Sequence, residues 1–299
     1  MDYHLPVMLT ESIEGLSIRP EGTYVDATFG GGGHSRAILE RLGPQGRLVA
    51  FDQDADALAN AIDDSRFSLI HENFRYMKNF LRLQGVRSVD GVLADLGVSS
   101  HQFDEAERGF STRLEGELDL RMDRRQELTA RTLVNSADEA ELTRLLRLYG
   151  ELPNAPQMAR AICRARAERE IVTTFDLREA VAHHLPRGAE NKYLAMLFQA
   201  LRIEVNGELE ALKALLQQAT ELLVPGGRLA VISYHSLEDR LVKNFFKTGN
   251  FEGVLEKDFY GNPLVPLQLV TRKAVVAGEE ELQRNSRARS ARLRVAEKR

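Results

Sequence analysis

The stretch Thr23–Ser35, TYVDATFGGGGHS, decides how this chain folds. Its first five residues are rich in β-branched and aromatic side chains and predict a buried strand over 23–27. Four consecutive glycines, residues 30–33, then form a turn without side chains, and His34–Leu42 has the apolar spacing of a helix. A strand, a glycine turn and a helix in this order are typical of a nucleotide-binding unit in an α/β protein.

Further strand and helix patterns follow this first unit. Four more segments are expected to be strands, at 46–52, 67–71, 89–95 and 227–233. Helical patterns alternate with them, and this alternation is typical of repeated strand-helix-strand units with a parallel sheet. We therefore predict an α/β fold with a doubly wound sheet.

The last two expected strands are far apart in the sequence. Asp95 and Gly227 are 132 positions apart, whereas a parallel crossover needs only about a dozen residues. The surplus has helical patterns, including a capping box at Ser136 to Glu139 and amphipathic segments at 155–167 and 174–185. We expect an all-α domain, residues 103–205, inserted into a domain built from residues 1–102 and 206–299.

Length and composition exclude several classes of protein. The chain has 299 residues, a formal net charge of −4 and one cysteine, Cys163. A single thiol forms no internal disulfide and no zinc site of the usual four-ligand kind, and no cluster of metal ligands has convincing spacing, so we expect no metal. No apolar stretch is long enough to span a membrane, and no basic segment precedes an apolar one near Met1. We expect a cytoplasmic protein.

The glycine turn and two carboxylates together predict a nucleotide-like cofactor. Asp52 ends the second expected strand, nineteen positions after Gly33, where a carboxylate can accept both hydroxyls of an adenosine ribose. Asp26 stands at the end of the first expected strand, before the glycines, where it would repel a pyrophosphate but suits the ammonium group of S-adenosylmethionine. The pattern favours methyl transfer, and the alternatives are a nicotinamide oxidoreductase and a non-catalytic nucleotide binder.

Polar residues also follow the fourth and fifth expected strands. Because the carboxyl ends of parallel strands meet at one edge of a sheet, we expect these side chains to face the reacting centre. A turn or a helix cap is the alternative interpretation, favoured for Ser236 and left open for His235. The candidate catalytic residues are Asp95, Ser99, Ser100 and His235.

Five spaced motifs occur in order along the chain: residues 26–35 (DATFGGGGHS), 95–100 (DLGVSS), 108–111 with 118–123 (RGFS and LDLRMD), 232–240 (ISYHSLEDR) and 285–290 (NSRARS). Together they resemble the bacterial 16S ribosomal RNA cytosine-N4 methyltransferase family, and the similarity runs from His4 to the C-terminus. The resemblance implies a Rossmann-like class I methyltransferase sheet with an inserted helical substrate-recognition domain. It also implies S-adenosyl-L-methionine as cofactor and, as substrate, a cytidine in the decoding region of 16S rRNA within the small ribosomal subunit.

The resemblance also implies individual cofactor contacts. A ring at Phe74, after the third strand, can lie on an adenine face, although a lone phenylalanine is by default a core residue. The assignment of Gln102 rests on the resemblance alone, and His101 stands where the family commonly has proline. The implied cofactor residues are Gly32, Gly33, His34, Asp52, Phe74, Asp95 and Gln102.

An RNA substrate requires phosphate contacts and a place for the extruded base. We expect Tyr234 or Phe110 to offer an aromatic face to that base. Residues 284–299 carry a local charge of +6 despite the negative total, and a solvated strand and tail is the alternative interpretation. No obligatory protein partner and no membrane is expected, and a homodimer is left open. An RNA-binding assembly factor without catalysis is a further alternative function. The other arginines expected to contact phosphate are Arg160, Arg164, Arg166 and Arg169.

Overall fold

The computed structural model describes residues 6–299 and divides into two compact units. One unit consists of the chain up to Gly97 together with Leu209–Arg299, and the other of Val98–Glu208. The expected insertion, 103–205, falls inside the second range, and its role in substrate recognition stays a prediction. His4 and Leu5, where the family similarity begins, lie outside the described residues.

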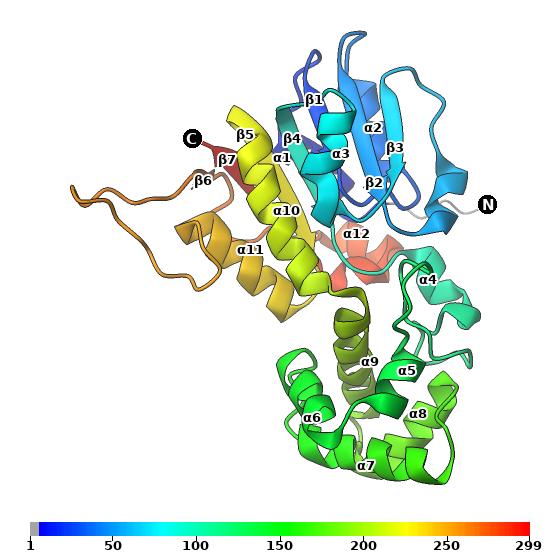
Figure 1. The fold of residues 1–299 in the computed structure, drawn as a ribbon. Helices are drawn as coiled ribbons and strands as arrows, with labels where there is room; N and C mark the ends of the chain where they lie inside the picture. Colours follow the sequence, from blue (N-terminus) through cyan, green and yellow to red (C-terminus); the bar gives the residue numbers. More distant parts are fainter. Residues whose placement is uncertain (1–5) are drawn as a thin grey trace. The chain divides into compact units, whose positions relative to one another are not determined.

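A seven-stranded sheet, counted over residues 6–299, is the centre of the first unit (Figure 1). The spatial order is β3-β2-β1-β4-β5-β7-β6, with the first five strands parallel and β7 antiparallel to both of its neighbours. The predicted doubly wound α/β sheet is therefore confirmed. The strands are β1 (Thr23–Asp26), β2 (Arg47–Asp52), β3 (Phe67–His71), β4 (Val89–Asp95), β5 (Leu223–Ser233), β6 (Leu267–Leu269) and β7 (Arg292–Lys298).

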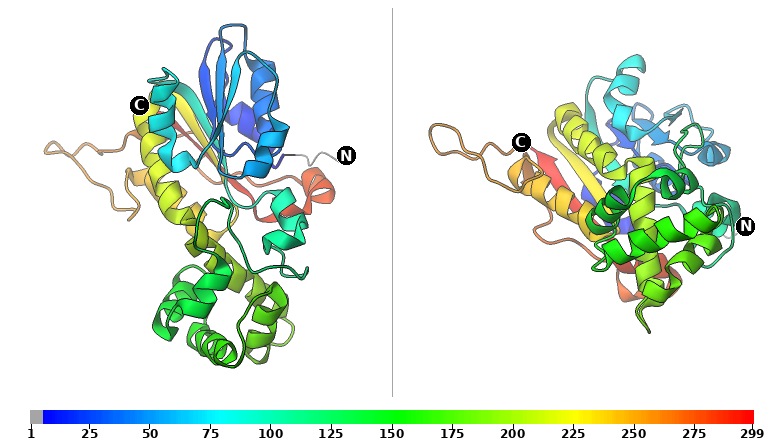
Figure 2. Two further views of the ribbon diagram at one scale, coloured as in Figure 1. Left: turned by 45° about the vertical axis from the view of Figure 1, so that its right-hand side comes forward. Right: turned by 60° about the horizontal axis from the view of Figure 1, so that its bottom comes forward.

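Helices cover both faces of this sheet (Figure 2). On one face, Ile13 and Ile38 of α1 and α2 pack in one core with Leu93 and Ile232. On the other face, apolar residues of α3, α10 and α11 pack with the alternate strand positions, among them Val92, as the period of two along a strand requires. These helices are α1 (Leu9–Leu16), α2 (Gly33–Arg41), α3 (Met77–Leu83), α10 (Glu208–Leu222) and α11 (Ser236–Thr248), with α12 (Glu279–Arg284) and the 3₁₀ turns η1 (Ala55–Asn60), η2 (Phe74–Tyr76) and η5 (Ser286–Ser290).

The second unit is helical. Its core joins Leu145 of α6, Ile162 of α7 and Leu197 of α9, all fully buried. No helix among residues 6–299 is long and apolar enough to cross a membrane. The helices of the second unit are α4 (Ser100–Asp104), α5 (Ala130–Ser136), α6 (Glu139–Leu148), α7 (Ala155–Glu168), α8 (Thr174–Val181) and α9 (Glu190–Asn206), with the 3₁₀ turns η3 (Ala106–Arg108) and η4 (Ala182–His184).

Two expectations about this unit are wrong. Ser136 does not cap α6: it is the last residue of α5, where its hydroxyl donates to the carbonyl of Thr132 at 2.7 Å. Asp138 caps α6 instead, because its backbone is extended and its carboxylate accepts the N–H of Glu141 at 2.7 Å. Phe110 is 3% exposed within the helical core, so its ring has no free face for a base.

Candidate cofactor and catalytic site

The glycine turn connects β1 to α2 and contains glycines of two kinds. Gly30 and Gly32 have φ angles of 51° and 75°, which favour glycine. A Cβ placed on Gly30 or Gly31 would meet no described atom within 4 Å, so the space beside these two residues is open. A Cβ on Gly33 would lie 2.2 Å from Cγ of Pro6. Gly33 is therefore required for packing against Pro6. The sequence alone did not distinguish this packing role from a role in ligand binding.

Neighbouring segments hold the turn in place. The N–H of Gly30 donates to Oδ2 of Asp52 at 2.7 Å. Nδ2 of Asn60 donates to the carbonyl of Gly30 at 3.1 Å, and the guanidinium of Arg36 donates to the carbonyl of Gly31 at 2.7 Å. These three hydrogen bonds hold the turn against neighbouring parts of the chain.

Asp52 lies at the carboxyl end of β2, beside the turn. Its Oδ2 accepts from Gly30, and its Oδ1 accepts the N–H of Asp54 at 2.8 Å. Each carboxylate oxygen has a second lone pair and can accept another hydrogen bond. Burial raises the pKa of Asp52 to about 6, although the two backbone hydrogen bonds oppose the rise. A half-buried acceptor next to open glycine backbone is compatible with the predicted ribose contact.

Asp26 is a second carboxyl at this edge of the sheet, and unlike Asp52 it is buried. It is 1% exposed, and it accepts hydrogen bonds from the hydroxyl of Ser35 at 2.7 Å and from the N–H of Thr28 at 3.1 Å. Burial raises its pKa to about 6. Because burial disfavours the charged form, a cationic ligand close to this carboxyl would stabilise it as the carboxylate.

Asp95 and Tyr234 connect the carboxyl ends of β4 and β5. The hydroxyl of Tyr234 donates to Oδ1 of Asp95 at 2.7 Å, and the N–H of Asp95 donates to the hydroxyl of Thr28 at 2.7 Å. Burial raises the pKa of Asp95 to about 6, while His34 and the Tyr234 hydrogen bond lower it. Sequence reasoning assigned Tyr234 only an aromatic role and missed this hydrogen bond, which depends on the pairing of β4 with β5.

His34 faces the same carboxyl group from the first turn of α2. Its Nε2 lies 3.1 Å from the carbonyl oxygen of Val7. A carbonyl only accepts hydrogen bonds, so Nε2 carries the proton of the neutral ring. Nδ1 lies 3.9 Å from Oδ2 of Asp95, and burial lowers the pKa of His34. In the neutral ring the proton is therefore on Nε2, and only the imidazolium form, which also carries a proton on Nδ1, stabilises the Asp95 carboxylate and lowers its pKa.

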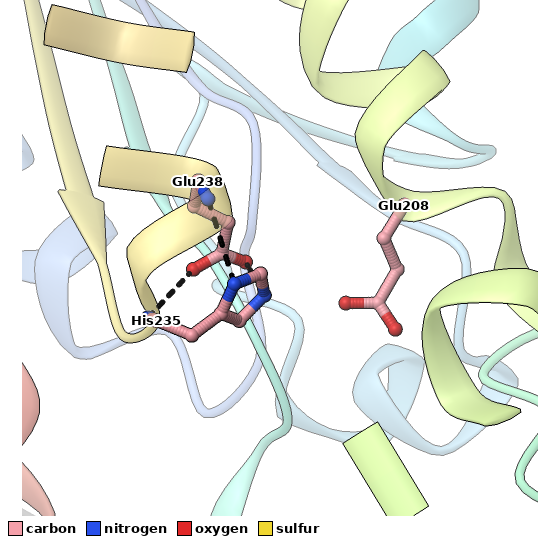
Figure 3. A group of neighbouring side chains, drawn as sticks. All are labelled: Glu208, His235 and Glu238. Carbon is pink, nitrogen blue, oxygen red and sulfur yellow. Dashed lines mark hydrogen bonds and ion pairs between the residues drawn. The ribbon is translucent and has the colours of Figure 1, made fainter. Parts of the chain in front are cut away.

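His235 occupies the N-cap position of α11 (Figure 3). Its Nε2 lies 3.2 Å from Oε1 of Glu238, while Oε2 of Glu238 accepts the N–H of Tyr234 at 2.8 Å. The N–H of Glu238 points to Nδ1 of His235 at 3.5 Å. His235 therefore caps a helix, which is the alternative that the sequence analysis left open for this residue. Its catalytic role stays a prediction.

Phe74 begins η2, directly after β3. Its ring is half-buried and packs against the core on the α3 face of the sheet. Part of the Phe74 ring therefore belongs to the hydrophobic core, as expected for a lone phenylalanine. Its stacking on adenine stays a prediction.

Three predicted site residues belong to the second unit and form the start of α4. The hydroxyl of Ser99 accepts the N–H of Gln102 at 3.2 Å, and Oε1 of Gln102 accepts the N–H of Ser99 at 3.1 Å. Ser100 is the first helical residue. Capping explains the reciprocal Ser99–Gln102 hydrogen bonds, and the catalytic and cofactor roles of these residues stay predictions.

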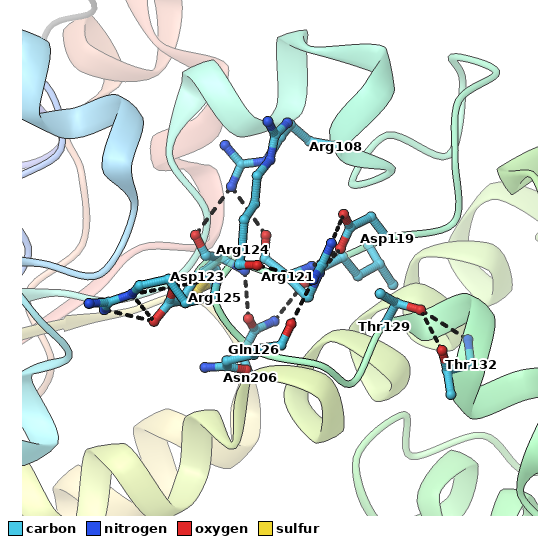
Figure 4. Close-up of polar contacts among 12 residues, drawn as sticks. Arg108, Asp119, Arg121, Asp123, Arg124, Arg125, Gln126, Thr129, Thr132 and Asn206 are labelled. Atoms are coloured by element: carbon cyan, nitrogen blue, oxygen red, sulfur yellow. Dashed lines mark hydrogen bonds and ion pairs between the residues drawn. The ribbon is translucent and has the colours of Figure 1, made fainter.

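The RGFS and LDLRMD motifs meet inside the second unit (Figure 4). Arg108 is 1% exposed, and its guanidinium donates to the carbonyls of Arg121 and Met122 at 3.1 and 3.3 Å. Asn206 of α9 accepts the N–H of Met122 at 2.7 Å and donates to the carbonyl of Leu120 at 2.8 Å. Leu120 has a φ of 61°, so these hydrogen bonds hold a left-handed backbone. Both motifs therefore have a structural role in this unit.

Several arginines expected on RNA phosphate are engaged within the protein. Residues 292–298 form β7 inside the sheet, so the basic C-terminal segment is not a free tail. Arg294 forms an ion pair with Asp239 at 2.7 Å, and Arg166 donates to the main-chain carbonyls of Val134 and Ala137. Arg160 and Arg169 pair with Glu139 and Asp176. The expected arginines that are exposed and have no carboxylate partner among residues 6–299 include Arg164, Arg284 and Arg289.

Similarity to known proteins extends over the whole chain. The model of the MraW methylase family matches residues 1–299. The chain belongs to the MraW methylase family. The chain is 58% identical to the ribosomal RNA small subunit methyltransferase H of Flavobacterium johnsoniae, over 100% of this chain and 98% of the relative. The protein of the same name from Phocaeicola vulgatus is 57% identical over 99% of this chain and 98% of its own length.

The family resemblance predicted from the motifs is thereby confirmed. Among solved structures, an rRNA methylase from Streptococcus thermophilus aligns over 100% of this chain and 98% of its own, with 12% identity and a TM-score of 0.44. A likeness at that level is too weak to bear on function.

Proposed function

We propose that this chain transfers a methyl group from S-adenosyl-L-methionine to the N4 amine of a cytidine in 16S rRNA of the small ribosomal subunit. The observation that carries the proposal is the arrangement of Asp95, Tyr234 and His34 beside the open glycine turn. Family membership and the names of the relatives support the same activity and the same cofactor. They confirm the predicted methyltransferase class and give no support to the nicotinamide alternative.

The residues at the sheet edge fit the cofactor. Asp52 and the open backbone of Gly30 and Gly31 would hold the adenosyl part, and the buried carboxyl of Asp26 and the half-buried carboxyl of Asp95 suit its positive charges. When bound, the cofactor supplies an electrophilic methyl group. Gly33 and His34 contribute by shaping the turn and by facing Asp95. Further contacts in the proposal come from Gly32, Phe74 and Gln102.

Asp95 is proposed to position the target amine. The lone pair of a cytosine amine is delocalised into the ring, so a hydrogen-bond acceptor on its N–H groups helps to localise that lone pair. Tyr234 fixes Oδ1 of Asp95, which leaves Oδ2 as the acceptor for the amine and for the proton that it releases. Preorganised acceptors of this kind act without reorganisation during the reaction. Ser99, Ser100 and His235 complete the proposed catalytic set.

The partners form part of the same proposal. The RNA is recognised within the small ribosomal subunit, and the place of action is the cytoplasm. Arg164, Arg284 and Arg289 are proposed to contact phosphate because their guanidinium groups are exposed. No obligatory protein partner is included in the proposal, and a homodimer is compatible with it.

The test is a methylation assay followed by nucleoside analysis. The protein is incubated with methyl-labelled S-adenosyl-L-methionine and small subunits that lack the modification, and the RNA is digested and separated. We expect label in N4-methylcytidine, and its disappearance with Asp95→Asn. The matched control is Asp63→Asn, which changes an exposed carboxylate at the protein surface. Label in another nucleoside, or none with the unaltered chain, would contradict the proposal.

A further inference from the structure

A long loop extends from the sheet unit between α11 and β6 (Figures 1 and 2, orange). We call residues 252–264 the aromatic arm. Two consecutive aromatic side chains at its tip, Phe259 and Tyr260, are 97% and 85% exposed, and Val254 is 62% exposed. Side chains this exposed add nothing to the core. Phe259 and Tyr260 are in contact and together form an exposed apolar surface that a ligand or partner can cover.

The arm is ordered by its own hydrogen bonds. The carboxylate of Asp258 accepts the N–H groups of Tyr260 and Asn262 at 2.9 and 2.8 Å and the side-chain amide of Asn262 at 3.0 Å. The N–H of Leu264 donates to the carbonyl of Glu256 at 2.9 Å. The tip therefore presents its rings on a preformed turn, which reduces the entropy cost of binding.

The two rings leave π faces available. Their centroids are 5.5 Å apart and their planes meet at 87°. In this edge-to-face arrangement the rings do not cover each other as stacked rings would. Exposed aromatic faces are what single-stranded RNA recognition uses, because every base has a π face that can stack on them.

The segments on either side of the arm are positively charged. Exposed cations flank it on both sides, Lys243 and Lys247 in α11 and Arg272 and Lys273 after β6. Residues 243–273 contain five Lys and Arg against three Asp and Glu, in a chain whose formal net charge is −4. One of the three acids, Asp258, has its carboxylate turned to the backbone of the turn. Within the arm itself Lys257 stands against three acids, so the cations that complement phosphate are mainly the four that flank the arm.

We propose that the aromatic arm binds single-stranded RNA by stacking Phe259 and Tyr260 on unpaired bases, with the flanking cations on the phosphates. The inference rests on the proposed function, which supplies an RNA substrate, and adds a binding surface outside the cofactor site. The arm belongs to the sheet unit and is distinct from the arginines already proposed for phosphate contact.

The experiment uses a fluorophore that the chain lacks. The sequence contains no tryptophan, so Tyr260→Trp places a single indole at the tip. We expect its fluorescence to be quenched when a single-stranded RNA fragment of the decoding region is added, and to change little with a duplex of the same length. Tyr260→Ala and Phe259→Ala should each weaken binding of the single strand by about fivefold to a hundredfold.

Salt dependence and a matched control sharpen the test. Because the tip variants remove stacking and leave every phosphate-binding cation in place, the slope of log affinity against log salt should stay unchanged. Leu83→Ala removes an apolar side chain that is 81% exposed on α3 and should leave RNA affinity unaltered. Affinity for S-adenosyl-L-methionine should be the same in all of these variants.

Each other outcome overturns the inference. Unchanged RNA affinity in the double variant Phe259→Ala/Tyr260→Ala excludes stacking. If the tip variants bind assembled subunits more weakly but bind naked RNA normally, the arm contacts a protein partner. If the tip variants sediment differently from the unaltered chain in the absence of RNA, the arm contacts a second copy of this chain. If the unaltered chain methylates RNA while the arm variants bind it normally, only the arm inference fails. If the unaltered chain methylates no RNA, the proposed function fails.

Discussion

Asp52 combines two tasks in one side chain. Its carboxylate holds the N–H of Gly30 and that of Asp54, and it is the proposed acceptor for the ribose hydroxyls. Asp52→Ala should therefore weaken cofactor binding by roughly 1.5–3 kcal/mol, the usual range for hydrogen bonds to a charged group. Calorimetric titration measures this change, with the exposed Asp63→Ala as control. An affinity equal to that of the unaltered chain would remove Asp52 from the site.

Tyr234 contributes to the protonation state of Asp95, together with burial and His34. Its hydroxyl stabilises the carboxylate and so lowers the pKa of Asp95, against burial and the charges of Asp26 and Glu238, which raise it. Tyr234→Phe removes this hydrogen bond and should raise that pKa further. The acid limb of single-turnover methylation against pH should then move to higher pH, with little change on the alkaline side. Identical pH profiles for both proteins would exclude a role for the hydrogen bond.

Asp26 makes the free protein less stable as the pH rises. Burial raises its pKa from 3.8 to about 6, so between these values the folded state binds more protons than the unfolded state. The free energy of unfolding therefore falls with rising pH in that window, by up to about 1.4 kcal/mol per pKa unit. Asp26→Asn lacks this titration, so its stability relative to the unaltered chain should increase from about pH 4 to about pH 6 and then level off. Denaturant unfolding checks this, and a difference that does not vary with pH would contradict it.

At the scale of the element, substitutions in the glycine turn distinguish a glycine that is needed for ligand binding from one that is needed for packing. Gly31→Ala adds a methyl group to open space at a residue without positive φ, so it should preserve the unfolding midpoint. Because the proposed adenosyl group lies against this backbone, the methyl group should obstruct it and lower cofactor affinity about tenfold, which corresponds to about 1.4 kcal/mol. Gly33→Ala should instead destabilise the fold, because its Cβ meets Pro6. The control is Gly278→Ala, which also faces open space. Normal cofactor affinity in Gly31→Ala would argue against a ligand at this turn.

Strands were predicted better than helix ends. Residues 67–71 and 89–95 are strands with the predicted bounds. The run at 89–95 is buried on both faces because β4 lies inside the parallel sheet, whereas β3 is an edge strand and most of its residues are half-buried. The α6 cap was misassigned, since Ser136 and Asp138 both fit the local pattern and only the end of α5 decides between them. Local sequence patterns therefore predict where a strand lies, but they do not decide between two possible helix ends when the end of a neighbouring helix determines which one forms.

The candidate site shows the same difference between features with a local sequence signal and features that depend on tertiary contacts. Asp52 and Asp95 could be predicted because strand ends and spacing place them at one edge of the sheet. The hydrogen bond from Tyr234 to Asp95 joins residues 139 positions apart, and the packing of Pro6 against Gly33 joins two segments that share no sequence pattern. Neither has a local signal, so both needed the tertiary structure.

At the scale of the whole molecule, ion pairs and hydrogen bonds within the protein determine which arginines are available to bind RNA. Arg166 and Arg294 look like surface cations in the sequence, yet they bind main-chain carbonyls and Asp239. We expect a variant with glutamate at Arg164, Arg284 and Arg289 to bind RNA more weakly, with a salt slope smaller by about 0.7 for each phosphate that is no longer neutralised. Filter binding at several salt concentrations measures both quantities. An unchanged slope would place the phosphate-binding surface elsewhere.

A crystal structure of the protein with S-adenosyl-L-homocysteine, the product of the donor, tests the central claim most directly. The account predicts the adenosyl group against Gly30 and Gly31, its ribose hydroxyls on Asp52, and the sulfur on the side of Asp95. A ligand bound away from the turn, or a ribose without contact to Asp52, would contradict it.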